Sequence, residues 1–345
     1  MRDVADPGVA AHLVDSSASQ HLGKYTTTQA AITAIAYVLM IVGQVIPSGI
    51  GKNIGDISRF YDSITVPPGA AFGIWGIIFL LQAVYIILNF VWRGDDTSGR
   101  NGQPDDLASM NYAVQWPLRF AFICQGAWSM LYKFVRNDYP PLPNSGKIGA
   151  ARGSALQSFD FYFWFCSILI FITVGAWYVV VWRIHRAVKR NEWTAGSRQI
   201  LIAYCGIFMN AGWITVAANI MPSSMVMVIT KIGDGGNVGM QIAALTSAFI
   251  VAIVVFLPMF SRKTKKANFV PMYFAVCWAF AWLSRRLWSH TNIDPQFEAM
   301  LVNTYTTKSF LSEHAFVAVY RWVALILCCV SFIFGGYGII EAVRS

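Results

Sequence analysis

The polar side chains that could do chemistry in this chain stand inside long apolar stretches, beside aromatic rings. Trp75, Phe79 and Gln82 follow one another at steps of four and three residues, and Asn89 comes seven residues later. These steps place all four side chains on one face of a helix. Two aromatic rings followed by two amides predict either a hydrogen-bonded seam between helices or the wall of a ligand pocket with a few polar contacts.

Two later stretches repeat this combination of an amide and aromatic rings. Gln125, Trp128 and Tyr132 share one helix face, and Asn210 and Trp213 share another. Because the same combination recurs in separate stretches, it favours a pocket built by several helices. The alternative, in which each polar residue packs against one neighbouring helix, stays open.

A catalytic site would need His, Asp, Glu or Cys side chains that converge on one place. The five histidines lie in tails, loops or the ends of apolar stretches, and Asp, Glu and Lys are absent from the middles of these stretches. The six cysteines lie within the stretches, without zinc-ligand spacing or a disulfide framework. We therefore expect a protein that is not an enzyme, with no catalytic residues and no metal site.

The elements that must position these side chains are membrane-spanning helices. Of the 345 residues, 56% are hydrophobic and 12% are charged, whereas soluble domains have about 25% charged residues. Apolar stretches of about 20 residues are long enough to cross a bilayer. The sequence predicts an all-α, polytopic membrane helical bundle with about eight transmembrane helices. The stretches are residues 29–48, 69–92, 112–134, 161–182, 200–222, 239–260, 269–288 and 316–340.

The net charge of +9 is concentrated in two connections, residues 183–199 and 261–268. Lys and Arg in short connections between spans indicate the cytoplasmic side of the membrane. They favour contact with anionic lipid headgroups over nucleic acid. We expect residues 1–28 to be a cytoplasmic tail and residues 29–345 to form a single transmembrane helical domain.

The second apolar stretch opens with Pro67 and Pro68 and then contains Gly69, Gly73 and Gly76. Prolines cost little in the first turn of a helix, where the amide hydrogens have no helical partner. Glycines three or four residues apart allow a neighbouring backbone to come close in lipid. We expect this glycine face to pack closely against another helix.

The segment PPGAAFGIWGIIF (residues 67–79) resembles the proline and tryptophan signature that opens the second span of the tryptophan-rich sensory protein, or translocator protein (TspO/MBR), family. FICQGAW (122–128) is similar to the family's Q/N-x-x-W element of the third span, and GWITVAAN (212–219) to its G-W-I-x-V-A segment. CWAFAW (277–282) fits a late tryptophan-bearing span of the long forms. The spacing differs from the short members, because Trp75 follows Phe72 by three residues rather than four.

The resemblance implies a helical bundle with an aromatic-lined pocket for hydrophobic or planar ligands such as porphyrins, and in animal members sterols. We therefore predict an integral membrane, multi-pass ligand-binding protein that acts as a sensor, carrier or chaperone. Its ligand would be a planar hydrophobic molecule such as a porphyrin, or a lipid or sterol. The predicted ligand-binding residues are those where helical stripe and resemblance coincide: Trp75, Phe79, Gln82, Gln125, Trp128, Asn210 and Trp213.

Arg119 completes this predicted site as a cation at the pocket mouth that meets a propionate. No cofactor is expected beyond a bound tetrapyrrole or lipid, since axial ligation of haem iron has no strong candidate. The expected partners are membrane lipids and a hydrophobic small-molecule ligand, with homo-oligomers and membrane-complex subunits left open.

Two other functions are compatible with the same residues. In a transporter or channel for an anionic solute, Arg119 and Arg321 would face inward and attract the solute. The alternative for both arginines is that they reach along the helix to the headgroups. A structural subunit of a larger membrane complex is the further alternative.

Overall fold

The structure is a computed structural model that describes residues 25–49, 68–91, 106–135, 161–189, 197–230, 236–260, 269–288 and 313–344. Within these residues there are eight α-helices, one short 3-10 helix and no strand. The all-α helical bundle predicted from the sequence is therefore confirmed. The elements are α2 (Thr27–Gly49), η1 (Gly69–Gly73), α4 (Ile74–Val91), α5 (Asp106–Tyr132), α7 (Phe161–Lys189), α8 (Ser197–Thr230), α9 (Gly236–Phe260), α10 (Val270–Trp288) and α12 (Glu313–Arg344).

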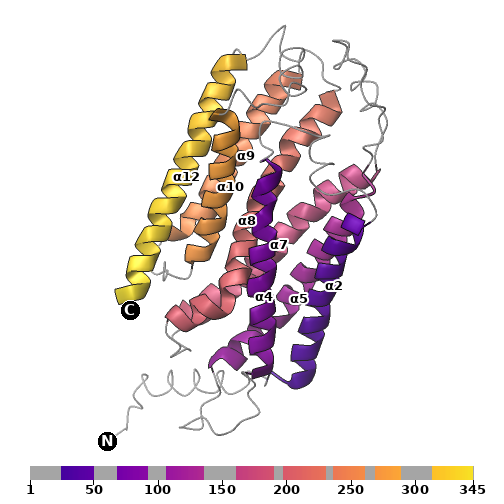
Figure 1. The fold of residues 1–345 in the computed structure, drawn as a ribbon, viewed down its shortest axis with the longest axis vertical. Helices are drawn as coiled ribbons and strands as arrows, with labels where there is room; N and C mark the ends of the chain where they lie inside the picture. Colours follow the sequence, from indigo (N-terminus) through magenta and orange to yellow (C-terminus); the bar gives the residue numbers. More distant parts are fainter. Residues whose placement is uncertain are drawn as a thin grey trace, which may run out of the picture.

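Five of the helices form a closed ring. α2 contacts α4 and α5, α5 contacts α7, and α8 contacts both α7 and α4. The other three helices lie outside this ring, where α9 and α10 pack against α8, and α12 packs against α9 and α10 (Figure 1). We call α2, α4, α5, α7 and α8 the five-helix ring.

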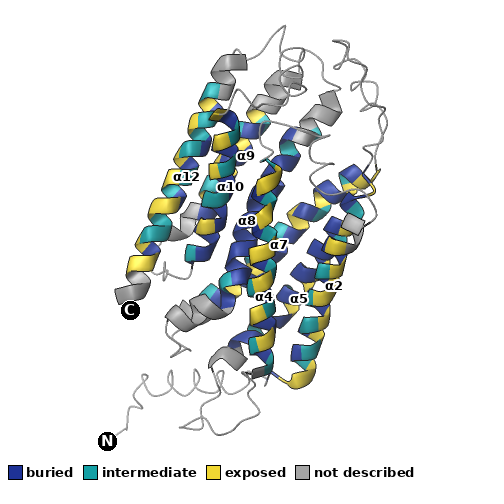
Figure 2. Ribbon diagram, viewed as in Figure 1, coloured by how far each residue is buried: buried dark blue, intermediate teal, exposed yellow. Residues whose placement is uncertain are grey.

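α8 is the central helix, and its burial follows from its composition. Every residue from 206 to 221 is buried, on all sides of the helix (Figure 2). A helix that is apolar all round is expected in the interior of a bundle, and α8 is shared between the five-helix ring and the outer helices. Since it serves both groups, it can place side chains into each of them.

The outer surface is suited to lipid. Large apolar side chains are exposed both on ring helices and on the helices outside the ring, for example Leu80 on α4 at 66% and Phe332 on α12 at 74%. Within the described residues, four helical stretches are long and apolar enough to cross a membrane: Thr27–Val45, Gly69–Phe90, Phe161–Arg186 and Ala318–Ile340. These helices indicate an integral membrane protein.

The start of α2 is fixed by a capping box. The Thr26 backbone N–H donates to Gln29 Oε1 (2.9 Å), and the Gln29 N–H donates to Thr26 Oγ1 (3.3 Å). Reciprocal bonds of this kind satisfy two amide donors that the first helical turn leaves unpaired. Tyr25, just before the helix, is buried. Of the expected tail, residues 1–24 lie outside the described residues.

The basic connection predicted at residues 183–199 is wrong at both ends. α7 continues to Lys189 and α8 already begins at Ser197. Arg183 is part of α7, where its Nη1 donates to the Ala113 carbonyl of α5 (2.8 Å). Arg186 lies over the Trp182 ring at 5.2 Å. Residues 190–196 and the connection 261–268 lie outside the described residues, so the cytoplasmic side stays a prediction.

The proline-rich opening of the second stretch forms a short 3-10 turn. Pro68 is extended, with φ −62° and ψ 155°, and stands directly before η1. Trp278 of α10 donates its indole N–H to the Ala71 carbonyl in η1 (2.9 Å). The turn is thus tied to a helix outside the five-helix ring before α4 begins.

The close packing predicted for the glycines of this stretch is wrong. A Cβ added at Gly69, Gly73 or Gly76 would have nothing within 4 Å, because these glycines face outward. The spacing of glycines shows which of them share a helix face, but it does not show whether that face contacts a neighbouring helix.

The close approaches occur at other glycines. A Cβ at Gly43 of α2 would stand 2.5 Å from the Gly126 carbonyl oxygen of α5. A Cβ at Gly206 of α8 would stand 2.7 Å from the Gln82 backbone nitrogen of α4. These contacts bring α2 against α5 and α8 against α4, which closes the five-helix ring tightly.

Candidate functional site

Aromatic rings gather where α4 begins. The Trp75 ring centroid lies 5.2 Å from that of Phe79 and 6.2 Å from that of Trp213, which it meets edge-on. Phe72 of η1 meets the same Trp213 edge-on at 5.7 Å. Trp75 and Phe79 are one helical turn apart on α4, and Trp213 projects from the central helix α8. The structure therefore brings these three predicted residues together.

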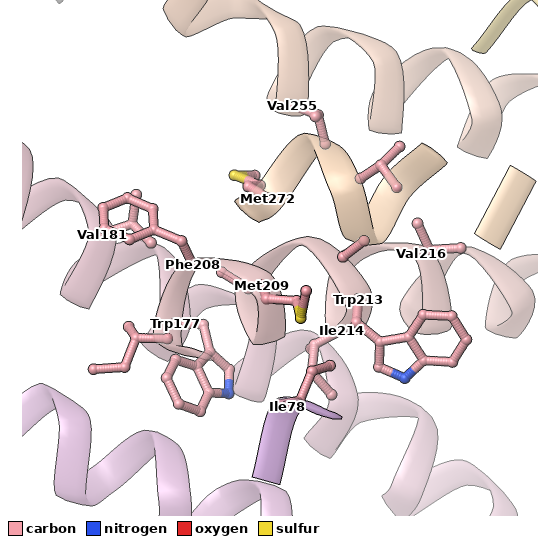
Figure 3. Packing of buried hydrophobic residues seen from close by; sticks show 14 of the residues in the cluster. Ile78, Trp177, Val181, Phe208, Met209, Trp213, Ile214, Val216, Val255 and Met272 are labelled. Atoms are coloured by element: carbon pink, nitrogen blue, oxygen red, sulfur yellow. The ribbon is translucent and has the colours of Figure 1, made fainter. Parts of the chain in front are cut away.

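Gln125 forms the polar centre of the ring interior. Its Oε1 accepts hydrogen bonds from Trp177 Nε1 (2.9 Å) and from Asn210 Nδ2 (2.7 Å). These bonds join α5, α7 and α8, and Gln125 and Asn210 are fully buried. Figure 3 shows Trp177 and Trp213 in the same core, with Ile78 and Ile214 between the two indoles in this view.

Several buried polar atoms on α4, α5 and α8 have no hydrogen-bond partner. They are both amide atoms of Gln82, the Nε2 of Gln125, the Oδ1 of Asn210 and the Nε1 of Trp213. We call these four residues the unpartnered polar set. Each such atom costs about 1–3 kcal/mol of stability relative to a hydrogen-bonded one. The atoms of the unpartnered polar set could therefore form hydrogen bonds with polar groups of a bound molecule.

Trp128 belongs to a neighbouring cluster. It stacks on Tyr132 at 5.2 Å and packs with α7 residues such as Phe163 and α8 residues such as Met221. Val174 of α7 packs against both this cluster and the larger core that contains Trp213. Trp128 is 4% exposed, and its indole N–H also has no partner. The single cavity predicted for all seven aromatic and amide residues stays a prediction.

Arg119 lies where α5 contacts the first turns of α2, and its role at a pocket mouth stays a prediction. Its side chain is buried and donates to Thr33 Oγ1 (3.0 Å), the Gln29 carbonyl (2.7 Å) and Gln115 Oε1 (2.9 Å). The bonds engage Nε and Nη2 of its guanidinium group. These bonds anchor α5 to the first turns of α2.

Other polar residues extend this anchored end of the five-helix ring. Asn111 Oδ1 accepts from the hydroxyls of Tyr85 (3.2 Å) and Tyr204 (2.6 Å), which joins α4, α5 and α8. The Tyr25 hydroxyl donates to Thr33 Oγ1 (3.2 Å), and burial raises the pKa of this phenol. The phenol thus stays protonated as a donor. At this end of the five-helix ring, hydrogen bonds between side chains satisfy many of the buried polar groups.

Sequence reasoning missed Trp177, Asn111 and Tyr204. Trp177 and Tyr204 stand in apolar stretches without an amide on the same helix face, and Asn111 precedes the predicted stretch 112–134. The predicted site residues were those with an amide and an aromatic ring on one helix face, and these three residues do not fit that pattern. Arg321, the second arginine of the anion-transporter alternative, lies over the Trp288 ring of α10 at 4.7 Å.

Comparison with known proteins gives one match. Residues 29–139 match the family model described as TSPO-like protein, which spans α2, η1, α4 and α5. The resemblance identified at residues 67–79 and 122–128 is therefore confirmed, while the segments at 212–219 and 277–282 fall outside the match. No curated protein and no solved structure matches the chain.

Proposed function

Residues 29–139 are TSPO-like, and on this premise we propose that the protein binds a planar hydrophobic ligand inside the five-helix ring. A porphyrin is the preferred ligand, ahead of a sterol or another lipid. The chain would act as a sensor, carrier or chaperone and would perform no reaction on the ligand. The matched helices form three of the five ring helices, and α7 and α8 complete the enclosure.

The unpartnered polar set is the observation that carries this proposal. Five buried polar atoms on three helices of the ring lack a protein partner. Gln82 follows Phe79 by three residues on α4, and Asn210 precedes Trp213 by three residues on α8, so these amides share helix faces with the aromatic rings. An apolar surface with a few polar groups is typical of small-molecule sites. Aromatic faces would hold a flat ring by offset stacking, which adds about 0.5–1.5 kcal/mol per pair. The amides would orient the polar groups at the ligand's edge.

The alternative of an anion transporter has less support. It needs Arg119 and Arg321 as inward-facing cations that attract a solute. Arg119 uses its guanidinium in three hydrogen bonds to α2 and α5, and Arg321 lies against Trp288 outside the five-helix ring. Both arginines are thus engaged with other parts of the protein.

The test is a titration of the purified protein in nanodiscs with protoporphyrin IX, followed by tryptophan fluorescence quenching and by the absorbance of the porphyrin. We expect saturable binding to the wild type. In Trp213→Phe, the smaller ring stacks less extensively and the indole N–H is lost, so the affinity weakens by up to about 12-fold, the equivalent of about 1.5 kcal/mol. Trp322→Phe is the matched control, because Trp322 is exposed on α12, outside the five-helix ring.

Gln82→Leu separates binding from packing. Replacing an amide that has no partner removes a buried unsatisfied group, so the variant is expected to unfold at a higher temperature than the wild type. If the amide meets the ligand, the same variant binds protoporphyrin more weakly. Absence of saturable binding to the wild type, or one affinity shared by Trp213→Phe, Gln82→Leu and Trp322→Phe, would refute the proposal.

A further inference from the structure

A line of buried polar groups without partners runs along one face of α5 beyond the ring centre. Gln125 and Ser129 stand four residues apart on one side of α5, and Lys133 follows four residues later in the turn after the helix. Gln125 Nε2, Ser129 Oγ and Lys133 Nζ are all buried, and none has a hydrogen-bond partner. By helix geometry the line is about 12 Å long, at about 1.5 Å per residue.

Lys133 is the residue that gives this line a charge. α5 ends at Tyr132, and the chain continues in a tight turn in which the Val135 N–H donates to the Tyr132 carbonyl (3.2 Å). Lys133 is 8% exposed. A lysine that reached out to the headgroups would expose its ammonium group, and here the Nζ is buried.

The described protein offers no carboxylate to this ammonium group. Within the described residues, carboxylates occur at Asp106, Glu313 and Glu341. Asp106 is the first residue of α5, about 40 Å from Lys133 along the helix at about 1.5 Å per residue. The two glutamates belong to α12, outside the five-helix ring. A charged ammonium group without a counter-ion is costly in a buried site, and the described residues supply none to Lys133.

We infer that Lys133 binds the anionic group, a carboxylate or a phosphate, of the molecule held in the five-helix ring. The inference rests on the proposed function and specifies its ligand class as an amphipathic anion. The apolar body would lie against the rings near Trp213 and Trp128, and Ser129 and the Trp128 indole would donate to the same anionic group. Lys133 thus takes the role that the sequence assigned to Arg119.

The experiment compares two ligands that differ only in charge. Protoporphyrin IX carries two carboxylates, and its dimethyl ester has the same ring without them. We expect the wild type in phosphatidylcholine nanodiscs to bind the diacid roughly 10- to 100-fold more tightly, the range for a charge-assisted hydrogen bond. In Lys133→Met this preference disappears, and in Lys133→Arg it is largely kept. Arg186→Met is the matched control with an unchanged preference, because Arg186 is exposed on α7.

Each outcome decides between the two proposals. If the wild type binds diacid and diester equally, or if Lys133→Met keeps the preference, the role of Lys133 is refuted and the aromatic site stands. If neither porphyrin binds, the proposed function fails. In that case the role of Lys133 is tested by the unfolding temperature of the protein in the presence of oleate or methyl oleate. Equal stabilisation of the wild type by the two compounds refutes the role, and so does stabilisation by oleate that persists in Lys133→Met.

A last comparison identifies the source of the anion. Phosphatidylglycerol is added to the nanodiscs, and the diacid is titrated into the wild type and Lys133→Met. A lipid phosphate that occupies Lys133 would weaken diacid binding to the wild type and leave the variant unchanged. Unchanged binding in both proteins assigns the site to the ligand carboxylate alone.

Discussion

Substituting Gly126 tests how tightly the five-helix ring is closed. A Cβ at this position would stand 2.8 Å from the Met40 Cα of α2, whereas carbon atoms in favourable contact lie about 3.5–4.0 Å apart. Gly126→Ala therefore forces α2 and α5 apart by about 1 Å along this contact. That displacement strains the bonds that tie the same two helices at Arg119. Overpacking of this kind costs about 1–3 kcal/mol.

Gly76→Ala provides the matched control on α4. An added Cβ at Gly76 has nothing within 4 Å, and alanine stabilises a helix interior by about 0.5–1 kcal/mol relative to glycine. The two substitutions add the same methyl group and should act in opposite directions, with a difference of about 1.5–4 kcal/mol from these two ranges.

The assay is thermal unfolding of both variants in one detergent, followed by intrinsic fluorescence. A lower unfolding temperature for Gly126→Ala and an equal or higher one for Gly76→Ala are expected. If Gly76→Ala is the more destabilised variant, the glycine face predicted from the sequence is the packed one and the helix contacts described above are wrong.

Three further predictions concern single contacts in the bundle. Gln125→Met leaves two buried donors without an acceptor but also removes the unpartnered Nε2 of Gln125, so the free energy of unfolding should fall by about 1–3 kcal/mol. Adding Asn210→Leu, which removes one of those donors, should recover part of the loss. Strictly additive effects of the two substitutions in thermal unfolding would contradict the hydrogen bond. Arg119→Leu should lower stability by about 2–4 kcal/mol through lost charge-assisted bonds while the preference for diacid over diester persists; loss of that preference would return the ligand role to Arg119. The Sγ atoms of Cys277 and Cys328 are 3.7 Å apart, so copper phenanthroline with oxygen should join α10 to α12 by a disulfide detectable by mass spectrometry, and two free thiols after treatment would contradict this contact.

The sequence predicted the helices well because the signals for a membrane helix are local. Length and apolarity determine whether a stretch spans the membrane, and the helices begin and end within a few residues of most predicted stretches. The exceptions are α5, which begins already at Asp106, α8, which ends only at Thr230, and the connection at 183–199, where α7 runs on through basic residues. Arg183 finds a carbonyl on α5 and Arg186 a ring on α7, which explains why positive charge did not end the helix.

The sequence also predicted which side chains share a helix face, but it did not predict which neighbouring helix each face contacts. The stripe of Trp75, Phe79 and Gln82 follows from 3.6 residues per turn, and its packing against α8 agrees with the helix face. The sequence could not show that Trp177 would donate to Gln125. That bond joins residues 52 positions apart, and no periodicity within one helix carries information about the other.

By itself, the sequence determined an all-helical membrane chain, the TSPO-like character of its first helices and which side chains share a face. All of these depend on local composition and helical periodicity. Only the tertiary structure decided which cation is bonded and which is left without a partner. Arg119 and Lys133 both lie in one apolar stretch and look alike in sequence, but α2 supplies oxygen atoms to Arg119, while Lys133 Nζ is buried without an acceptor. Whether a buried charge has a counterpart depends on which helices are neighbours, and that follows from packing between distant segments.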